Sequence, residues 1–269
     1  MNRKESYKEH LTDLTNEFLK TGNAENLAKY LTSNSNLPGP RGNLELAEVF
    51  ADVVEDNGRG ESEKLWDLCM RLTQFSPVEA PVNNPKEFLV FCGARGVGVL
   101  GSSSTFFQKA LSCLKELASD SRWRTREAVA MAIQSMIEKQ PQETLKELEN
   151  WIENDNWLVM RAVAAGVAEP ALLKDKQTAK SAHELHKKIF AKVVDAQERK
   201  PEIKTLKQGL GYSLSVVVCA IPEEGFEYMR QLVDTQNAII LWIVRENLKK
   251  NRLIKNFPKE VASIKKLLK

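Results

Sequence analysis

The chain has 269 residues, of which 42% are hydrophobic and 28% are charged, and its formal net charge is +3. These fractions are those of a folded, soluble protein. No apolar run approaches the roughly 20 residues that a membrane-spanning helix needs. The N-terminal segment also lacks the apolar core of a secretory signal peptide. We therefore expect a protein that stays out of the membrane and resides in the cytoplasm.

The N-terminal third is predicted to be helical. Residues 36–43 and 76–84 are rich in proline, glycine and asparagine, so they cannot continue a helix and are expected to be connectors. Between and before them, apolar residues recur at helical spacing. The expected helices are 6–20, 23–31, 44–54 and 62–72, with a turn at 56–60 that joins the last two. The connector 76–84 suggests a boundary between N-terminal helical pairs at 1–84 and a repeat region at 85–269, within one continuous solenoid.

The stretch Phe88–Gly101 has an unusual pattern. Phe88–Cys92 resembles a buried strand, and Gly96–Gly101 satisfies G-x-G-x-x-G, the turn that binds phosphate in dinucleotide sites. Such a site needs a strand before the turn and alternating strands and helices after it. The surrounding residues are helical, and the amphipathic helix 104–118 occupies the position where the acidic residue of such a site is expected. We interpret the glycines instead as small contacts where two helices cross.

A repeated helix start organises the centre of the chain. Asp120–Ile133 reads D-S-R-W-R-T-R-E-A-V-A-M-A-I, the motif recurs at Asp155–Val163, and a third, looser copy spans Asp234–Leu248. Asp120 and Ser121 are suitable N-caps for the helix that follows. A second apolar helix starts after Pro141, so one unit is a pair of antiparallel helices that recurs after about 35 residues. A single pair cannot bury its apolar face, whereas stacked pairs share a continuous core.

The C-terminal part continues this organisation. The expected helices are 176–194, 206–220, 222–233, 238–250 and 257–268, and that at 206–220 is apolar on most sides, as a buried helix would be. The chain is therefore predicted to be all-α, a right-handed α-α superhelix of about six to seven antiparallel helix pairs.

The motif D-x-x-W-x-x-R-E-A-V-A-x-A-I resembles the first helix of a HEAT repeat. In that family an aspartate and an arginine at these positions form ladders between neighbouring repeats. The resemblance implies ladder roles for Asp120, Arg126, Asp155, Arg161, Asp234 and Arg245.

Part of the same region resembles HEAT-like-repeat alkylpurine DNA glycosylases. Trp123 and Glu127 stand where that family carries a tryptophan and its catalytic aspartate, and the segment Trp157–Arg161 resembles the one that supplies its active-site arginine. The resemblance implies Glu127 as the catalytic carboxylate and Trp123, Trp157 and Arg161 as nucleic-acid contacts. Glu127 departs from the family, since an aspartate is expected there, and its alternative role is an ion pair in the first helical turn.

A basic cluster near the C-terminus is a second candidate for nucleic acid. Arg245, Lys249 and Arg252 are spaced four and three apart, so in a continuous helix they would share one face and could hold phosphates. Trp242 could stack beside Arg245. The alternative is that these bases complement the C-terminus of a helix and keep the last repeat polar.

Metal and cofactor chemistry is not expected. The four cysteines (Cys69, Cys92, Cys113 and Cys219) form no C-x-x-C pair and lie in apolar helical stretches, so they are interpreted as reduced core residues. His183 and His186 would share one helical face, but no third ligand accompanies them. We predict that both are solvated surface residues and that the chain carries neither metal nor cofactor.

The sequence therefore favours a HEAT-repeat binding or scaffold protein. Its concave surface, made by the second helix of each pair, would receive a protein or a nucleic acid. The alternative is a DNA glycosylase-like repair protein, or an inactive relative that still holds DNA. The sequence contains no Ser/His/Asp order, P-loop or zinc-protease motif that would point to another enzyme class.

Overall fold

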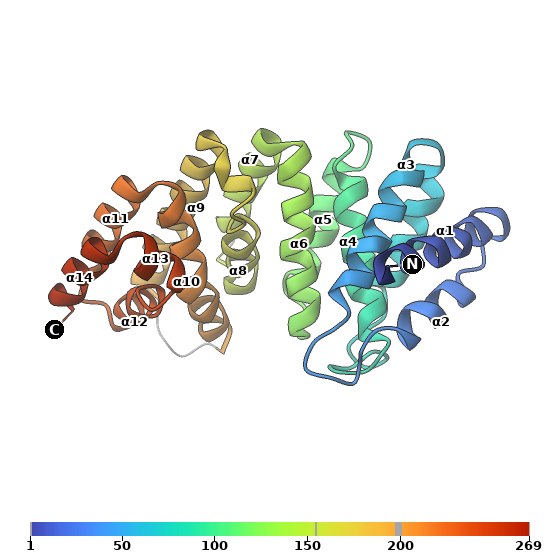
Figure 1. The fold of residues 1–269 in the computed structure, drawn as a ribbon, viewed down its shortest axis with the longest axis horizontal. Coiled ribbons are helices and arrows are strands. Elements are labelled where there is room, and N and C mark those ends of the chain that lie inside the picture. The colour runs from blue at the N-terminus through green and yellow to red at the C-terminus, as the bar shows by residue number, and fades with distance from the viewer. Residues whose placement is uncertain (1, 154, 197–200, 269) are drawn as a thin grey trace. The chain divides into compact units, whose positions relative to one another are not determined.

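The computed structural model describes residues 2–153, 155–196 and 201–268, and Figure 1 shows these residues as a succession of helices. Fourteen α-helices, one short 3-10 turn and no strand are found in these ranges. The predicted all-α fold class is confirmed. Within the same ranges, no helix is both long enough and apolar enough to cross a membrane.

The helices divide into two compact units, unit 1 (Met1–Met136) and unit 2 (Ile137–Lys269). The helices that begin in unit 1 are α1 (Arg3–Thr21), α2 (Glu25–Ser33), α3 (Leu44–Thr73), α4 (Glu87–Gly101), α5 (Phe107–Leu117) and α6 (Trp123–Lys139). The division falls in the last turns of α6. Unit 2 continues with α7 (Pro141–Ile152), α8 (Trp157–Gly166), the 3-10 turn η1 (Leu172–Lys174), α9 (Lys176–Val194), α10 (Pro201–Ala220), α11 (Pro222–Asp234), α12 (Ala238–Asn247), α13 (Asn251–Asn256) and α14 (Pro258–Leu267).

Helix α3 is a hairpin of two helical arms. Its backbone is helical through the predicted turn at 56–60 and breaks only at Glu61, where φ is −127° and ψ is 31°. A Cβ added to Gly96 would meet the ring of Phe50, from the first arm, and the sulfur of Cys69, from the second arm. These two residues would lie about 28 Å apart in a straight helix. The predicted pair of helices is therefore present, but the predicted turn is wrong, since one non-helical residue is enough to reverse the chain.

Helix α4 is the central helix of unit 1. It packs against both arms of α3 and against α2 and α5, and nearly all of its residues are buried. The strand-like segment Phe88–Cys92 is part of this helix, because an apolar run marks burial on all sides without specifying the backbone. Gly93 lies against the Cys69 carbonyl, and Gly98 lies against Ala132 of α6. The predicted role of the glycines as close helix contacts is confirmed.

Unit 2 is built of two layers of helices. Helices α8, α10 and α12 lie side by side in one layer, while α7 and α9 lie side by side in the other. Each helix from α7 to α12 also packs against the next one along the chain. Alternate helices thus share a layer, which is the packing expected when helix pairs stack into a common core. Helix α14 packs on α11 and α13 at the C-terminal end of the unit.

Two helices of unit 2, α8 and α12, are capped by asparagine. The side-chain oxygen of Asn156 accepts from the N–H groups of Leu158 and Val159 at the start of α8, and Asn237 caps α12 in the same way. Asp155 and Asp234 begin the motif copies in the sequence but are not the caps. The backbone explains this for Asp155, whose φ of 49° is left-handed, whereas an N-cap takes an extended conformation. Asn154, part of the predicted helix break, lies outside the described residues.

The predicted helix 238–250 is shorter in the structure. Helix α12 ends at Asn247, Lys250 is extended with φ −74° and ψ 129°, and α13 starts at Asn251. Asn247 accounts for this end, because its buried side chain donates to the carbonyls of Leu210 and Ile243 and accepts from the N–H of Ser215. The helix is thereby anchored to α10 at its last residue.

The two histidines of α9 are buried, so their predicted place on the surface is wrong. His186 is fully buried, with Nδ1 2.8 Å from the Ala182 carbonyl and Nε2 2.9 Å from the Ser213 hydroxyl of α10. Since a carbonyl only accepts, Nδ1 carries the proton and Nε2 accepts from Ser213. His183 packs edge-on against the Tyr228 ring of α11. The neighbouring helices α10 and α11 bury this face of α9, which the spacing within α9 does not reveal.

Burial of His186 predicts that stability falls in mild acid. Burial lowers its pKa from 6.5 to about 4, so between these values the unfolded chain binds a proton that the folded chain does not. The free energy of unfolding should therefore decrease by roughly 2 kcal/mol between pH 6.5 and 5. Urea unfolding at several pH values measures this. His186→Gln should reduce this dependence of the free energy of unfolding on pH, whereas substitution of the exposed His10 by Gln should leave the dependence unchanged. Equal slopes in both variants would contradict the assignment to His186.

Candidate binding groove

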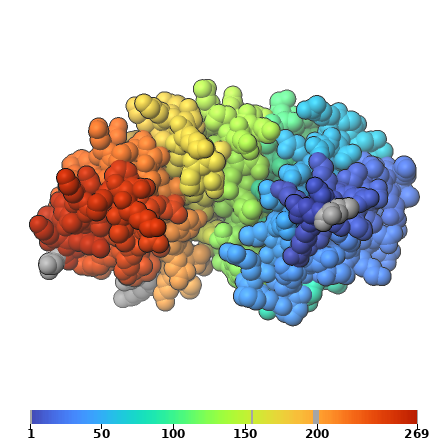
Figure 2. All heavy atoms as spheres, in the orientation of Figure 1, coloured from blue at the N-terminus to red at the C-terminus, as the bar shows by residue number. Residues whose placement is uncertain are grey.

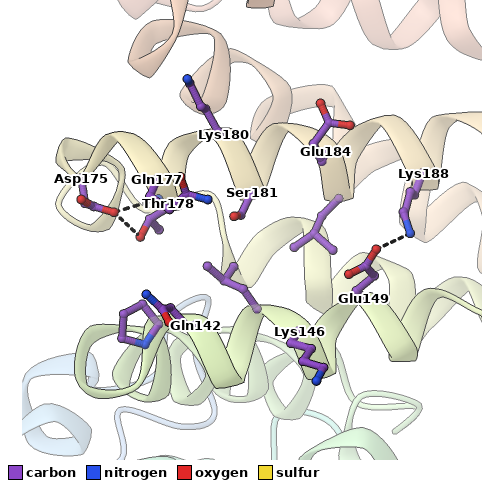
Figure 3. Close-up of a pocket in the computed structure, with 13 residues that line it drawn as sticks. Gln142, Lys146, Glu149, Asp175, Gln177, Thr178, Lys180, Ser181, Glu184 and Lys188 are labelled. Carbon is purple, nitrogen blue, oxygen red and sulfur yellow. Dashed lines mark hydrogen bonds and ion pairs between the residues drawn. The ribbon is translucent and has the colours of Figure 1, made fainter.

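A groove of about 750 Å³ runs between α7 and α9 of unit 2 (Figure 3). Gln142 and Gln177 line one end of it, and Glu149 and Lys188 line the other. The two helices therefore run in the same direction, as alternate helices of a stack do. Both are the second helices of their pairs, the layer expected to carry the binding surface.

Local sequence positions both walls of the groove. Pro141 occupies the first position of α7, where its missing N–H costs no hydrogen bond. Asp175 caps α9, and its carboxylate accepts from the N–H and the hydroxyl of Thr178, each at 2.8 Å. The hydrogen bond from the Thr178 backbone is the main cause that lowers the Asp175 pKa. The carboxylate is thus ionised and committed to the helix start.

The floor of the groove is apolar and its edges are polar. Leu145 of α7 and Leu185 of α9 both line it, and only 7% and 4% of their surfaces are exposed. At one end Lys188 forms an ion pair with Glu149 across the groove (Figure 3). That hydrogen bond raises the Lys188 pKa. The ion pair bridges the two walls at that end of the groove.

The acidic side chains that line the groove all have partners within the protein, whereas two of its lysines do not. Three lysines and three acids line it, but each acid has a partner: Asp175 caps α9, Glu149 pairs with Lys188, and Glu184 pairs with Lys187 at 3.1 Å. Lys146 and Lys180 make no hydrogen bond or ion pair with any residue that the structure describes. In Figure 3 they extend from opposite walls, each away from the other helix. The groove therefore offers two uncommitted cations flanking an apolar floor.

In unit 1, the predicted site residues lie at the start of α6. Asp120 forms a buried ion pair with Arg122 at 2.6 Å, and its carboxylate also accepts from the Arg122 N–H at 2.7 Å. Arg126 donates to the carbonyls of Asp120 and Ser121 at 2.6 and 3.0 Å, within its own repeat. Trp123 is 44% exposed, and Glu127 lies one turn further along α6 and is half-buried.

In unit 2, the other predicted residues are dispersed. Arg161 of α8 is buried, with its side chain against Gly209 of α10. Trp157 is half-buried at the first position of α8, exposed Asp155 pairs with Lys192 at 2.6 Å, and Asp234 is the exposed last residue of α11. The catalytic, nucleic-acid and ladder roles of these residues remain predictions.

The predicted basic face does not form as a single helical face. Arg245 lies on α12, Lys249 lies in the connector and Arg252 lies on α13, because the helix is interrupted at Lys250. Arg245 donates to the Leu268 carbonyl at 3.1 Å, and Lys249 pairs with Glu246 at 2.5 Å. Figure 2 shows this C-terminal part in red at the surface of unit 2. Trp242 stacks with Lys207, whose Nζ lies 4.6 Å from the ring centre, and not with Arg245.

Several residues of the groove were not predicted. The apolar stripe of α7 includes Leu145, but the stripe cannot tell whether such a residue ends under a neighbour or at the edge of a groove. Lys146 and Lys180 look like any other exposed lysine in the sequence. Outside the groove, in unit 1, the sequence could have indicated Arg122 and Arg124 as residues of interest. The run R-W-R-T-R places three guanidinium groups beside an aromatic ring.

Comparisons with known proteins give no family for the chain. No protein-family model matches the sequence, and no curated protein matches it. Among solved structures, the chain is similar to a designed armadillo repeat protein, with 14% identity, a TM-score of 0.29, and coverage of 82% of this chain and 98% of that chain. The helix contacts described above, and not this distant similarity, define an all-helical protein with stacked helix layers.

Proposed function

We propose that this protein is a binding scaffold of stacked helix pairs, of the right-handed HEAT type with six to seven pairs, and that the groove between α7 and α9 receives a segment of a partner protein. The observation that carries the proposal is the apolar floor of Leu145 and Leu185 between two uncommitted lysines. A partner segment would place apolar side chains on the leucines and carboxylates beside Lys146 and Lys180.

The chemistry of the groove supports binding in preference to catalysis. Its lining contains no histidine or cysteine, and the described residues contain no cluster of three metal-binding side chains. Each acid in the lining is engaged by a hydrogen bond or an ion pair within the protein, so none is poised for proton transfer. Peptide grooves combine an apolar floor with a few polar groups at the edge in this way.

Selection from a random dodecapeptide display library tests the proposal. Peptides selected on the wild-type protein should combine leucine or phenylalanine with flanking acidic residues. The double variant Lys146→Glu/Lys180→Glu should bind them about tenfold more weakly in fluorescence anisotropy, because reversing two exposed charges removes about 1–2 kcal/mol. Both lysines are exposed, so the variant should fold.

A matched control makes the same charge change elsewhere in unit 2. Lys265→Glu/Lys266→Glu on α14 alters two exposed lysines outside the groove and should leave the affinity unchanged. If no peptide is enriched, or if both double variants lose affinity equally, the groove is not the binding surface.

A further inference from the structure

A second surface lies in unit 1, outside the groove and independent of it. The Trp123 ring stands beside the loop residues Pro38 and Pro40 and beside Val82, around a shallow pocket of about 610 Å³. Trp123 is 44% exposed and Val82 is 51% exposed. We call this surface, lined by Pro38, Gly39, Pro40, Val82, Asn83, Trp123 and Arg124, the Trp123 ledge.

A buried network holds the ledge rigid. Arg124 Nη1 lies 3.0 Å from Glu87 Oε2, and the two side chains are 6% and 0% exposed. The other terminal nitrogen of Arg124 donates to the Gly39 carbonyl at 2.7 Å, while Glu87 accepts from the N–H of Asn83 at 2.7 Å. The loops that carry Pro38 and Asn83 are therefore tied to α4 and α6. A surface fixed in this way loses little entropy on binding.

The ledge presents no uncompensated charge to a ligand, although an arginine lines it. The Arg124 guanidinium stacks on the Trp123 ring, 4.3 Å from its centre, and its charge is compensated by Glu87. No other ionisable side chain lines the pocket. A charged ligand thus gains nothing here, and an apolar ligand is favoured.

Two N–H donors at the ledge are available. The indole N–H of Trp123 has no hydrogen-bond partner among the residues described. The Asn83 side-chain oxygen accepts from the Gly39 N–H and from Arg124, at 2.8 and 3.4 Å, which identifies it as the oxygen and leaves the amide nitrogen as a donor. That amide nitrogen donates to no residue in the described part of the chain. A ligand should therefore present backbone or side-chain carbonyls to these two groups.

We propose that the Trp123 ledge binds a proline-rich segment of a partner in the polyproline II conformation. Such a helix has no internal hydrogen bonds, so its carbonyls are free to accept, and its rings pack on aromatic and proline surfaces. It is also uncharged and loses little entropy on binding. The apolar rings, the two free donors and the compensated arginine match these three properties.

The experiment uses the full chain labelled with 15N at its five tryptophan indoles, and decaproline as the probe. Trp123→Phe identifies the Trp123 indole signal by its loss. Decaproline should shift that signal downfield and leave the other four in place, because only that N–H gains an acceptor. A glycine–serine peptide of the same length should shift none.

Anisotropy titrations of fluorescein-labelled decaproline with variants separate the contributions of the Trp123 ring and of the two N–H donors to binding. Trp123→Ala should weaken binding about tenfold. Trp123→Phe, which keeps a ring, and Asn83→Asp, which keeps the accepting oxygen but loses the donor, should each weaken it less. Trp242→Phe and Lys146→Glu/Lys180→Glu lie in unit 2 and should have no effect, so this result is separate from that of the groove.

Two outcomes would overturn the proposal. Decaproline that leaves the Trp123 signal unmoved excludes it, as does a Trp123→Ala variant that binds with unchanged affinity. If an oligothymidine shifts the signal and decaproline does not, the ledge stacks nucleobases instead. Circular dichroism verifies that each variant folds, and the exposed position of Trp123 favours this.

Discussion

Arg124→Ala is expected to lower the free energy of unfolding by about 3–5 kcal/mol, the cost of leaving a buried charge without its partner. Glu87 is fully buried, and Arg124 is its ion-pair partner. The substitution also removes the hydrogen bond to the Gly39 carbonyl, so the loop at 36–43 loses its attachment to α6. Urea unfolding followed by circular dichroism measures the change.

An exposed arginine provides the control. Arg230 pairs with Glu227 at 2.9 Å, but both side chains are well exposed, so Arg230→Ala should change stability by less than about 0.5 kcal/mol. The double variant Glu87→Gln/Arg124→Met should lose less than Arg124→Ala, because no buried carboxylate is then left uncompensated. Equal midpoints for Arg124→Ala and Arg230→Ala would mean that the buried pair does not stabilise unit 1.

Gly98→Ala is expected to destabilise unit 1 by about 3 kcal/mol through overpacking. A Cβ at this position would lie 2.6 Å from the Cα and Cβ of Ala132 and 2.9 Å from its carbonyl oxygen. Backbone atoms cannot rotate away, so α4 and α6 would have to separate. The roughly 1 kcal/mol that alanine gains over glycine in a helix is too small to offset this. Thermal and urea unfolding both report the loss.

Gly60→Ala is the matched control, because a Cβ added there meets no atom within 4 Å and the residue does not adopt the left-handed conformation. It should be neutral or slightly stabilising through helix propensity. If Gly98→Ala were equally well tolerated, α4 and α6 would not be in the close contact described, and the central place of α4 in unit 1 would be wrong.

The helices of this protein were predictable because their signals are local. Apolar residues three and four apart, prolines at 141, 222 and 258, and connectors rich in proline and glycine mark most of the helices near their true ends. The two errors in the predicted helix boundaries have different causes. Asp56–Gly60 resembles a turn but stays helical, and 238–250 looks continuous although the Asn247 side chain ties α12 to α10. A hydrogen bond to a distant helix leaves no trace in the spacing of one segment.

The candidate sites depend on contacts between residues far apart in the chain. Helical periodicity identified α7 and α9 as amphipathic, but the groove exists because alternate helices lie side by side and leave Leu145 and Leu185 at its floor. Likewise the sequence indicated Trp123 as a binding residue, whereas the loops that carry Pro38 and Val82 are held beside it by the hydrogen bonds of Arg124 to Gly39 and of Asn83 to Glu87. Local spacing thus accounts for the helical fold and its repeat, since a helix depends on neighbours three and four residues away. Which charges are buried and paired, and which remain available to a ligand, follows from packing between segments that the chain separates by tens of residues.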